Sequence, residues 1–535
     1  MNLPATIANS LWLASNIPAL VRFQRALRCP AETQLQLLRA LLSRNANCAH
    51  GQAHGFSQIK NYQEFAARVP LNDYEALQPW MERVRHGAQR ELTSEAVTQL
   101  IPTSGSSAAR KLIPFTASLQ REFDSAIGPW IADIYRQHPD VMLGPAYWSI
   151  SPAVTIKDRE TSVVPIGFED DSAYLGGVKK RLVNAVMAVP AELRLVSDME
   201  QFRYLTLLCL LRQKDLRLIS IWHPSYLSLL LDALPAFFEN LLDDIRTGQC
   251  RYADVLPANV LRALKLRPLP FRAKELKDVN PNHYEAIWPR LKMISCWGDA
   301  NAAYGLAELQ RRFPGVRIQP KGLIATEAIV TIPFCGRHPL AIGSHFFEFI
   351  DEQNSICLAH ELQKDKIYEV VVTNGAGLWR YRLKDLVQVT DFIGQTPSLC
   401  FLGRSENVSD RFGEKLSEVF VTQAIQFATS GLSLPPRFTL LAPDEDGLGC
   451  RYILYLEGEI QPGLVLRLEA ALLENPHYAW CRKLGQLQPA NVFQIGSNAY
   501  KIFVADQLAH GKKLGEIKPC SLSVRTGWTK VFANK

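Results

Sequence analysis

Three short segments carry residue types suited to nucleotide chemistry, and the first spans residues 103–111, with the sequence TSGSSAARK. Four hydroxyl side chains and one glycine stand there between apolar residues. Small residues let a backbone approach a polyanion, and their N–H and O–H groups donate to phosphate oxygens. Lys111 adds a mobile positive charge. The spacing is not that of the glycine-rich P-loop motif, and by composition alone a plain Ser/Gly turn is favoured over a phosphate site.

The second segment spans residues 322–330 and holds one carboxylate, Glu327, among small and apolar residues. A carboxylate in such surroundings is costly unless it is paired or bound to a cation. Mg²⁺ usually takes one or two protein carboxylates together with phosphate oxygens. Glu327 is therefore a candidate Mg²⁺ ligand. The segment alone leaves open the alternative that Glu327 is paired with a nearby Arg or Lys.

The third segment, residues 379–387, places Asp385 among alternating apolar and basic residues, and Arg404 ends a short apolar run further on. A buried carboxylate is a natural acceptor for the two hydroxyls of a ribose, and Arg404 could contact the same sugar. Taken alone, the pair is better explained as a structural ion pair. No Ser-His-Asp order or nucleophile-elbow motif accompanies it, so hydrolase chemistry lacks support.

Strands and helices alternate along most of the chain, which is typical of an α/β fold. Residues 32–43 show an apolar stripe at helical spacing. Further helices are predicted at 202–211 and 226–242. Short β-rich runs lie between the helical ones, at 216–222, 291–297, 367–372 and 399–402.

The chain changes character after Arg404, where a polar stretch precedes a second set of elements. This βαββαβ-like set comprises a helix near 417–430, strand-like runs at 437–441 and 452–456, a helix at 464–473 and an apolar run at 492–504. It is large enough to have a core of its own. We therefore predict a large domain over residues 1–405 and a small domain over residues 406–535.

The bulk composition excludes several classes of protein. Single hydrophobic cores stop growing at about 250–300 residues, so a chain of 535 residues needs at least two domains. An apolar fraction of 47% and a charged fraction of 21% fit a globular protein. The net charge of +7, without a long basic run, suits anionic small molecules and gives no indication of nucleic-acid binding.

The sequence also bears on the compartment. No uninterrupted apolar run is long enough to span a membrane. The apolar residues 11–21 are expected to form a helix that packs on the body of the protein, with contact to a lipid surface as the less favoured alternative. Eleven scattered cysteines without a CxxC pair or a Cys/His cluster fit reduced thiols in the cytoplasm and make a zinc site improbable.

Taken in order, the segments TSGSSAARK, GLIATE, YRLKD and GRSENVSDRFGEK resemble four motifs of the adenylate-forming superfamily, which includes firefly luciferase and acyl-CoA synthetases. Those motifs are the phosphate loop, the Mg²⁺ glutamate, the ribose aspartate and the hinge segment. The chain resembles more specifically the auxin-responsive acyl acid amido synthetases of plants and their bacterial relatives. Residues 34–87, 216–234, 343–350 and 515–519 carry this closer resemblance. It implies an α/β fold with a large N-terminal domain, whose sheets are flanked by helices, and a small, mobile α+β C-terminal domain.

The resemblance also implies roles for single residues. Positions that match ATP-binding residues are Thr103, Ser104, Gly105, Ser106, Ser107, Gly298, Thr326, Asp385 and Arg404. The first five match the phosphate loop, Asp385 the ribose site and Gly298 the loop that borders adenine. Glu327 matches the Mg²⁺ ligand. Lys111 and Lys518 match catalytic lysines, and Lys512 and Lys513 are close enough in sequence to compete with Lys518.

Some positions depart from the family pattern. Ala108 and Ala109 stand where glycine is common, which would stiffen the phosphate loop. Lys384 replaces the glycine that usually precedes the ribose aspartate, and it brings a positive charge beside that site. Residues 324–326 replace a more hydroxyl-rich or tyrosine-bearing run, so the resemblance does not define how adenine stacks there.

The function implied by the resemblance is ATP-dependent acyl acid amido synthesis. A carboxylic acid would be adenylated with release of pyrophosphate, and its acyl group would pass to an amine, such as that of an amino acid, with release of AMP. The expected nucleotide and metal are ATP and Mg²⁺. An acyl-CoA ligase, which shares the first step but uses a thiol acceptor, is an alternative, and a non-catalytic nucleotide-binding protein is an alternative of another class.

Overall fold

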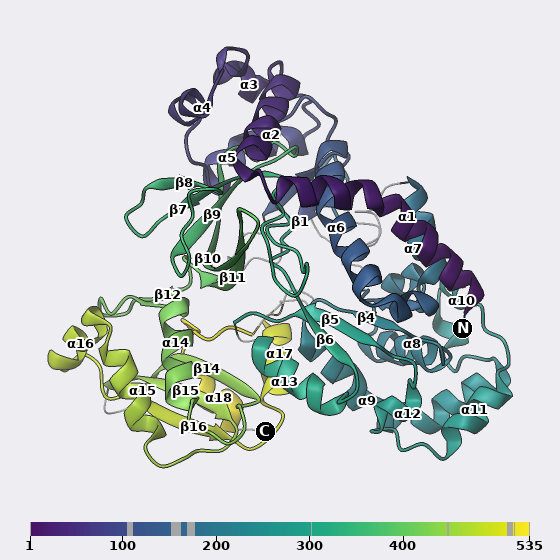
Figure 1. Ribbon diagram of the computed structural model, residues 1–535. Coiled ribbons are helices and arrows are strands. Elements are labelled where there is room, and N and C mark those ends of the chain that lie inside the picture. Colours follow the sequence, from purple (N-terminus) through teal and green to yellow (C-terminus); the bar gives the residue numbers. More distant parts are fainter. Residues whose placement is uncertain are drawn as a thin grey trace.

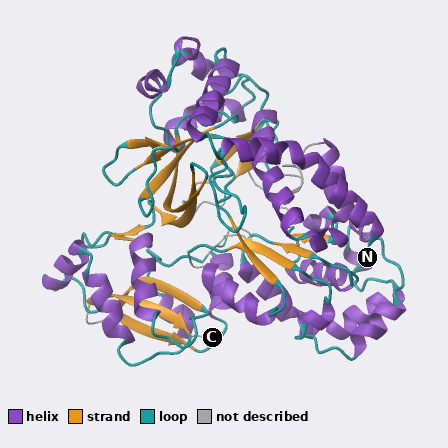
Figure 2. Cartoon of the chain, in the orientation of Figure 1, coloured by secondary structure: helices purple, strands orange, loops and turns teal. Residues whose placement is uncertain are grey.

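The structure is a computed structural model that describes residues 2–103, 111–150, 162–167, 177–300, 302–446, 449–510, 517 and 519–533. Its larger sheets are a five-stranded antiparallel sheet, a four-stranded parallel sheet and a three-stranded sheet near the C-terminus (Figure 2). Helices separate and cover them, so the expected α/β fold is confirmed. None of the described helices is long and apolar enough to cross a membrane.

The first helices belong to the same core as the antiparallel sheet. They are α1 (Leu3–Ala26), α2 (Pro30–Asn45), α3 (Ala49–Ala53), α4 (Tyr62–Arg68) and α5 (Tyr74–Arg85). Trp12 of α1, Leu38 of α2 and Phe65 of α4 are buried in one cluster with Phe346 of the sheet. The helices expected at residues 11–21 and 32–43 are therefore present as parts of α1 and α2.

The antiparallel sheet has the strand order β11-β10-β9-β7-β8. Its strands are β7 (Phe346–Ile350), β8 (Ile356–Leu358), β9 (Ile367–Thr373), β10 (Tyr381–Ile393) and β11 (Thr396–Arg404). Burial alternates residue by residue along most of β10, because successive side chains of a strand point to opposite faces. Gly394, with φ of 63°, makes the tight turn that joins β10 to β11.

A hairpin and two helices connect these parts to the parallel sheet. They are β1 (Gln99–Pro102), β2 (Leu112–Phe115), α6 (Ala117–Gln137) and α7 (Gly177–Val186). Thr116 caps α6 by accepting a hydrogen bond from the Leu119 N–H. In Figure 1, α1 runs along the outer edge of the molecule over α6 and α7.

The parallel sheet has the order β3-β4-β5-β6 and a core of its own. Its strands are β3 (Ala146–Trp148), β4 (Leu218–Ser220), β5 (Met293–Trp297) and β6 (Arg317–Lys321). The helices around it are α8 (Met199–Leu211), α9 (Pro224–Thr247), α10 (Ala258–Leu264), α11 (Pro270–Lys277), α12 (Tyr284–Ile287) and α13 (Ala302–Arg312). The expected elements at 202–211, 226–242, 216–222 and 291–297 correspond to α8, α9, β4 and β5.

The C-terminal elements surround a three-stranded sheet with the order β14-β15-β16. They are β12 (Val408–Ser409), β13 (Leu416–Ser417), α14 (Glu418–Thr429), β14 (Phe438–Asp446), β15 (Gly449–Glu457), α15 (Leu464–Leu473), α16 (Pro476–Lys483), β16 (Asn491–Ile495), α17 (Ala499–Ala509) and α18 (Trp528–Ala533). The two faces of this sheet pack into two separate hydrophobic clusters. The apolar run at 492–504 is not one strand: it divides into β16 and the first part of α17.

Candidate functional site

The ends of the expected phosphate loop are fixed by the β1–β2 hairpin. The Thr103 N–H donates to the Lys111 carbonyl oxygen at 2.9 Å, directly beyond the last paired residues of the hairpin. The Leu112 N–H donates to Tyr74 Oη at 3.0 Å, and Lys111 Nζ lies 5.9 Å from the centre of the Tyr74 ring. Lys111 therefore lies at the mouth of the loop. The loop residues Ser104, Gly105, Ser106, Ser107, Ala108 and Ala109 lie outside the described residues.

Glu327 lies in a tight turn that follows β6. An isolated bridge between Ile324 and Ile329 closes this turn, and Thr326 and Glu327 stand inside it. The Asn374 side chain donates from Nδ2 to the Glu327 carbonyl oxygen at 2.7 Å. The Glu327 side chain is half-buried, and within the described part of the chain its carboxylate forms no direct ion pair.

A buried pair of ionisable residues braces this turn from behind. His345 Nε2 accepts the Ile329 N–H at 3.2 Å, which places the imidazole proton on Nδ1, and that nitrogen lies 3.0 Å from Glu122 Oε2. The same carboxylate accepts the Gly375 N–H at 2.9 and 3.0 Å. Glu122 of α6 thus ties together the Glu327 turn and the backbone next to Asn374.

Asp385 and Arg404 face one another across strands β10 and β11. Arg404 donates from Nε to Asp385 Oδ1 at 3.2 Å, and the Asp385 side chain is buried while 42% of the Arg404 side chain is exposed. Lys384 has a left-handed φ of 62° within an irregular stretch of β10. Such irregularities re-aim neighbouring side chains, and a left-handed φ favours glycine, the residue that the resemblance leads us to expect at this position.

The charges around the site shift the titration of Glu327 and Arg404. Burial raises the pKa of Glu327, the positive charges of Arg404 and Lys111 oppose that rise, and the negative charge of Asp385 adds to it. Asp385 and Glu327 in turn raise the pKa of Arg404. These mutual effects require proximity. The structure therefore brings together Lys111, Glu327, Asp385 and Arg404, which are far apart in the sequence.

The chemistry of this donor set fits Mg²⁺ with a polyphosphate. Among the residues that the structure describes, no group of three or more His, Cys, Asp and Glu side chains could hold a metal ion by itself. Mg²⁺ needs no such group, because it usually binds one or two carboxylates and completes its shell with phosphate oxygens and water. Glu327, near the mouth of the loop at Lys111, supplies one hard oxygen donor of the required kind.

The loop after β5 approaches the same region. Gly298 packs so closely that an added Cβ would lie 2.8 Å from the Pro320 Cβ. The next residue, Asp299, accepts the Phe401 N–H at 3.0 Å, which ties the loop to β11 three residues before Arg404. Burial raises the pKa of the Asp299 carboxyl. Gly298 thus stands beside the strand that carries one side of the candidate site.

Ser405, the residue directly after β11, is hydrogen-bonded to residues of β10 and β9. The Ser405 N–H donates to the Lys384 carbonyl oxygen at 2.9 Å, and its hydroxyl donates to Glu369 Oε2 at 3.1 Å. Arg382 makes two hydrogen bonds with the same Glu369 carboxylate, at 2.7 and 2.9 Å. Lys518, Lys512 and Lys513 lie outside the described residues.

Sequence reasoning missed several residues that shape this region. Glu122, His345, Glu369 and Arg382 were not singled out, although each is an ionisable residue within or beside an apolar element. A lone charge in an apolar run was the signal that identified Glu327. The same signal was available for these residues, but their partners lie up to 223 positions away and have no sequence signature.

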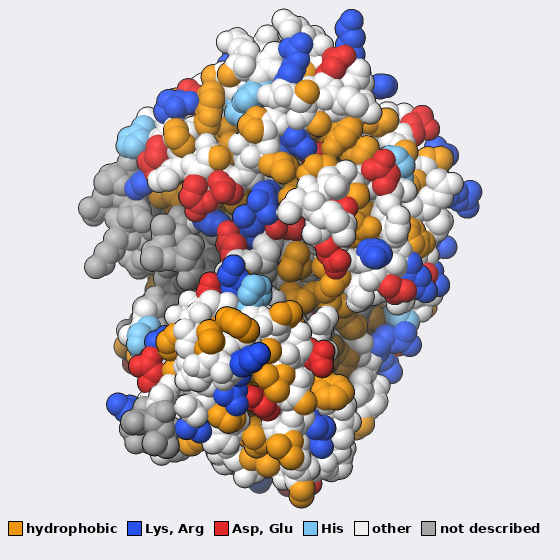
Figure 3. Space-filling model, turned by 90° about the vertical axis from the view of Figure 1, so that its left-hand side faces the viewer, with side chains coloured by type: hydrophobic (Ala, Val, Ile, Leu, Met, Phe, Trp, Pro, Cys, Tyr) orange, Lys and Arg blue, Asp and Glu red, His pale blue; other side chains and the backbone are white. Residues whose placement is uncertain are grey.

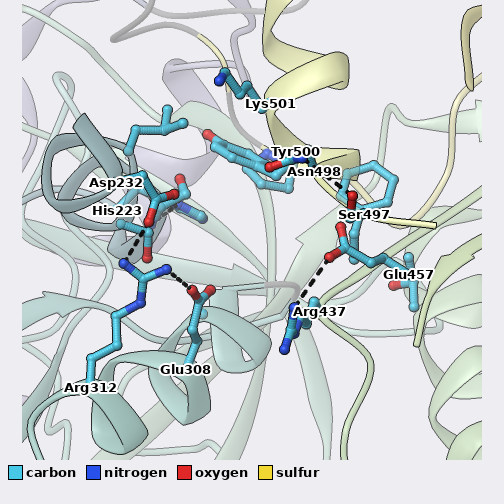
Figure 4. A pocket seen from close by; sticks show the side chains of 17 residues that line it. His223, Asp232, Glu308, Arg312, Arg437, Glu457, Ser497, Asn498, Tyr500 and Lys501 are labelled. Atoms are coloured by element: carbon cyan, nitrogen blue, oxygen red, sulfur yellow. Dashed lines mark hydrogen bonds and ion pairs between the residues drawn. The ribbon is translucent and has the colours of Figure 1, made fainter. Parts of the chain in front are cut away.

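A separate pocket of about 180 Å³ lies where α9 and α13 meet the C-terminal domain (Figure 4). The His223 and Tyr500 rings are stacked across this contact, with centroids 6.3 Å apart, and Arg312, Arg437 and Lys501 contribute charge to its lining. Its lining contains none of the expected ATP residues. On the face seen in Figure 3 the surface is hollowed between the two parts of the molecule, and acidic and basic side chains gather along the boundary.

Three family models match consecutive parts of the chain: the GH3 family N-terminal domain over residues 19–318, the GH3 family central domain over 338–404 and the GH3 family C-terminal domain over 419–526. Indole-3-acetic acid-amido synthetase GH3.3 of Arabidopsis thaliana is 25% identical over 464 residues, which are 80% of this chain and 75% of the relative. Probable indole-3-acetic acid-amido synthetase GH3.12 of Oryza sativa subsp. japonica is 25% identical over 571 residues, covering 93% of this chain and 92% of the relative.

A solved structure, AtGH3.15 acyl acid amido synthetase in complex with 2,4-DB, superposes with a TM-score of 0.84 at 19% identity, over 98% of this chain and 96% of that one. The fold is therefore that of the solved acyl acid amido synthetases. The chain belongs to the GH3 family. It is accordingly a ligase that forms carbon–nitrogen bonds, and the expected family and enzyme class are confirmed.

Proposed function

We propose that this ligase activates a carboxylic acid with ATP and then transfers the acyl group to the amine of an amino acid. In the first step an oxygen of the acid attacks the α-phosphorus, the bond to the β-phosphate breaks, and pyrophosphate leaves. In the second step the amine nitrogen attacks the acyl carbon, the bond to the AMP oxygen breaks, and the amine loses a proton. The convergence of Glu327, Asp385, Arg404 and Lys111 carries this proposal.

The first step brings two anions together, so positive charge has to be supplied where they meet. Lys111 at the mouth of the loop is suited to the phosphates, and Asp385 can accept hydrogen bonds from the ribose hydroxyls while Arg404 orients the carboxylate. Mg²⁺, when held by Glu327 and phosphate oxygens, supplies further charge neutralisation. The Glu122–His345 brace keeps the Glu327 backbone in place, so that little reorganisation is needed during reaction.

The second step is proposed to involve a turn of residues 406–535 relative to residues 1–405. Ser405 is a suitable pivot, since its contacts to Lys384 and Glu369 hold the last residue of the large part. Lys518 is proposed to act from the small domain, with Lys512 and Lys513 as alternatives. Excluding water from the adenylate during this step would limit its hydrolysis.

We propose a flat or apolar acid as the substrate. Aromatic side chains support this at the edge of the parallel sheet, where the Trp297 and Phe401 rings lie 5.4 Å apart and Trp222 is partly exposed beside the Lys321 ammonium, at 4.9 Å. The relatives named after indole-3-acetic acid use an acid of this kind. All eleven cysteines are free thiols, which supports the proposal of a cytoplasmic location.

Pyrophosphate exchange into ATP, measured with Mg²⁺ and a panel of acids, tests the adenylation site. We expect Glu327→Ala and Lys111→Ala to lower the exchange rate by about 10²–10³. Glu352→Ala and Lys364→Ala are matched controls, because both side chains are exposed in turns of the antiparallel sheet. Exchange by the Glu327 and Lys111 variants at the wild-type rate would show that the site has been placed wrongly.

The acceptor is tested by supplying amino acids and coenzyme A in separate reactions. An amide detected by mass spectrometry supports the proposed function, and a thioester would instead identify an acyl-CoA ligase. Nucleotide binding without exchange on any acid would identify a non-catalytic binding protein. Membership of the GH3 family favours the amide product.

A further inference from the structure

Helix α1 exposes an apolar face that nothing in the described part of the chain covers. The first 21 residues of the sequence contain no Asp, Glu, Lys or Arg. Large apolar side chains on the outer side of the helix are 39–58% exposed, namely Leu3, Ile7, Leu11, Ile17 and Val21. At about 100° per residue these positions fall on one side of the helix, so they form a single stripe.

Between Leu3 and Val21, the polar residues of α1 are buried on its inner side or hydrogen-bonded within the helix. Asn9 and Asn16 are buried on the inner side, where Asn9 Nδ2 donates to the Met142 and Gly144 carbonyl oxygens. The Ser10 hydroxyl donates back to the Thr6 carbonyl oxygen at 2.8 Å. A surface helix normally shows the opposite arrangement, with polar residues outside.

Basic residues follow directly at the C-terminal end of the stripe. Arg22, Arg25 and Arg28 are exposed, and in the described part of the chain none of the three forms an ion pair. The stripe from Leu3 to Val21 covers 18 helical steps, a length of about 27 Å. An exposed apolar helix face of this length, followed by a group of arginines, offers the two features by which interfacial helices bind lipid: apolar area and positive charge.

We propose that α1 docks the protein on an anionic lipid surface, with the helix parallel to the membrane plane. The apolar stripe (Leu3, Ile7, Leu11, Ile17 and Val21) would enter the boundary between headgroups and acyl chains, and the three arginines would contact the anionic headgroups. The charges beside the stripe favour an anionic lipid surface over a second copy of the chain as the partner. The exposed side of α1 carries no carboxylate to pair with arginines of another α1, whereas anionic lipids supply many negative charges.

The position of α1 is compatible with a flat partner. The helix runs along the outer edge of the molecule, packed on its inner side against α6 and α7 (Figure 1). The exposed stripe therefore faces away from the helices on which α1 packs. The inference does not rest on the proposed function, because the stripe contains none of the residues assigned to ATP or Mg²⁺.

Co-sedimentation of the full chain with vesicles tests this docking. We expect binding to vesicles of phosphatidylcholine and phosphatidylglycerol, and much weaker binding to phosphatidylcholine alone. The double variant Ile7→Glu/Leu11→Glu should bind at least about tenfold more weakly, because two apolar side chains that would enter the membrane are lost. Arg22→Ala and Arg25→Ala should each weaken binding roughly fivefold and reduce its sensitivity to salt.

Phe271→Glu is the matched control, since Phe271 is a highly exposed apolar residue on α11 in the same domain. It should bind vesicles like the wild type. The melting temperature and the pyrophosphate exchange of the Ile7/Leu11 variant should be unchanged, which shows that the fold is intact. Vesicle binding that is absent, or equal for wild type and variant, overturns the proposal. A dimer in analytical ultracentrifugation that the same variant dissociates would identify the stripe as a protein interface instead.

Discussion

The carboxyl of Glu327 is where burial and neighbouring charges most directly affect the proposed chemistry. Its pKa is raised by burial, and Arg404 opposes that rise. A metal ligand must be ionised, so activity should fall on the acid side as pH drops through this raised pKa. Arg404→Gln removes the opposing charge, raises the pKa further and should move the acid limb of the pH profile of pyrophosphate exchange to higher pH.

Arg337→Gln is the control for this profile. Arg337 is a half-exposed arginine of the same large domain that pairs with Asp391, at 3.0 Å, and not with the site. The acid limb of the pH profile of Arg337→Gln should coincide with that of the wild type. An acid limb that stays in place in Arg404→Gln would show that Glu327 does not govern the pH dependence.

His50 gives a second, independent pH effect, on stability. It is buried, its ring is stacked with that of Trp379, and burial together with the charge of His54 lowers its pKa from 6.5 to about 3. The unfolded chain therefore binds a proton between these values and the folded protein does not, so stability falls as pH drops below 6.5. Between pH 7 and pH 5 the free energy of unfolding should fall by about 2 kcal/mol through this residue.

His50→Phe removes the titrating group while keeping a ring in the apolar surroundings. Chemical denaturation at pH 7 and pH 5 should show a smaller loss of stability for this variant than for the wild type. An equal loss in both proteins would mean that His50 does not contribute.

At the residue scale, the sequence was informative where one unusual side chain stood in a local context that required an explanation. Glu327 and Asp385 are acids among apolar residues, so their surroundings alone pointed to pairing or binding. The sequence left open whether Asp385 and Arg404 form a structural pair or a ribose site. The structure contains their hydrogen bond, and a partly exposed Arg404 beside a buried Asp385 is compatible with both.

Among the elements, β10 is the one whose local distortion affects the site. Lys384 adopts a left-handed conformation directly before Asp385. Valine, which is branched at Cβ, is strained in that conformation, so Lys384→Val should destabilise the protein by about 1–3 kcal/mol. Lys384→Gly relieves the strain but loosens the unfolded chain, so its stability should stay within about 1 kcal/mol of the wild type. Melting temperatures of the Lys384→Val and Lys384→Gly variants test this. Equal destabilisation by the two substitutions would show that the left-handed backbone at residue 384 does not limit stability.

The Glu122–His345 brace connects α6 with the Glu327 turn. Removing the imidazole in His345→Ala leaves the Ile329 N–H and the Glu122 carboxylate without this partner, which should cost about 1–3 kcal/mol. Because the turn then moves, pyrophosphate exchange should fall about ten- to a hundredfold. Glu122→Gln keeps an oxygen acceptor, so this variant should retain most of the stability and most of the exchange activity.

Asp244→Asn tests whether lost stability alone explains that fall. Asp244 is buried near the parallel sheet and accepts from Tyr204 Oη at 2.7 Å, away from the Glu327 turn. A variant there should lower the melting temperature with little change in exchange rate. If both variants slow exchange in proportion to lost stability, the brace has no specific role in positioning Glu327.

Periodicity predicted the elements well where one pattern ran through a whole element. The helix expected at 464–473 is α15, with the same bounds. The run at 492–504 was apolar throughout, and an apolar run does not distinguish strand from helix. The structure breaks it at residues 496–498, where Asn498 has a left-handed φ of 61°, so that a strand and a helix share the run.

At the scale of the whole molecule, α9 and α17 form one of the contacts between the C-terminal domain and the rest of the protein, and α14 with β11 forms another. Tyr500 is stacked on His223 and hydrogen-bonded to Ser225, and its burial raises its pKa to about 12. Tyr500→Ala should release this restraint and increase proteolytic cleavage near Ser405 about two- to tenfold, as expected for the loss of one aromatic pair. Trp480→Ala, at an exposed aromatic residue of the same domain, should leave cleavage unchanged.

The division into residues 1–405 and 406–535 remains a prediction at this scale. No local sequence signal determines how two domains are oriented, because their contact depends on side chains from distant elements such as His223 and Tyr500. A cleavage rate that does not respond to Tyr500→Ala would show that other contacts fix the small domain.

The adjacency of Arg404 and Ser405 has a thermodynamic consequence. Arg404 is bonded to Asp385, and the next residue along the chain is bonded to Lys384 and Glu369. A change in the Arg404–Asp385 hydrogen bond therefore affects the hydrogen bonds of Ser405, because Arg404 and Ser405 share one peptide unit. Coupling of this kind is reciprocal: if a bound nucleotide shifts the orientation of the small domain, that orientation changes the affinity for the nucleotide by the same factor. AMP would then be retained or released according to the position of the small domain, without any separate sensor.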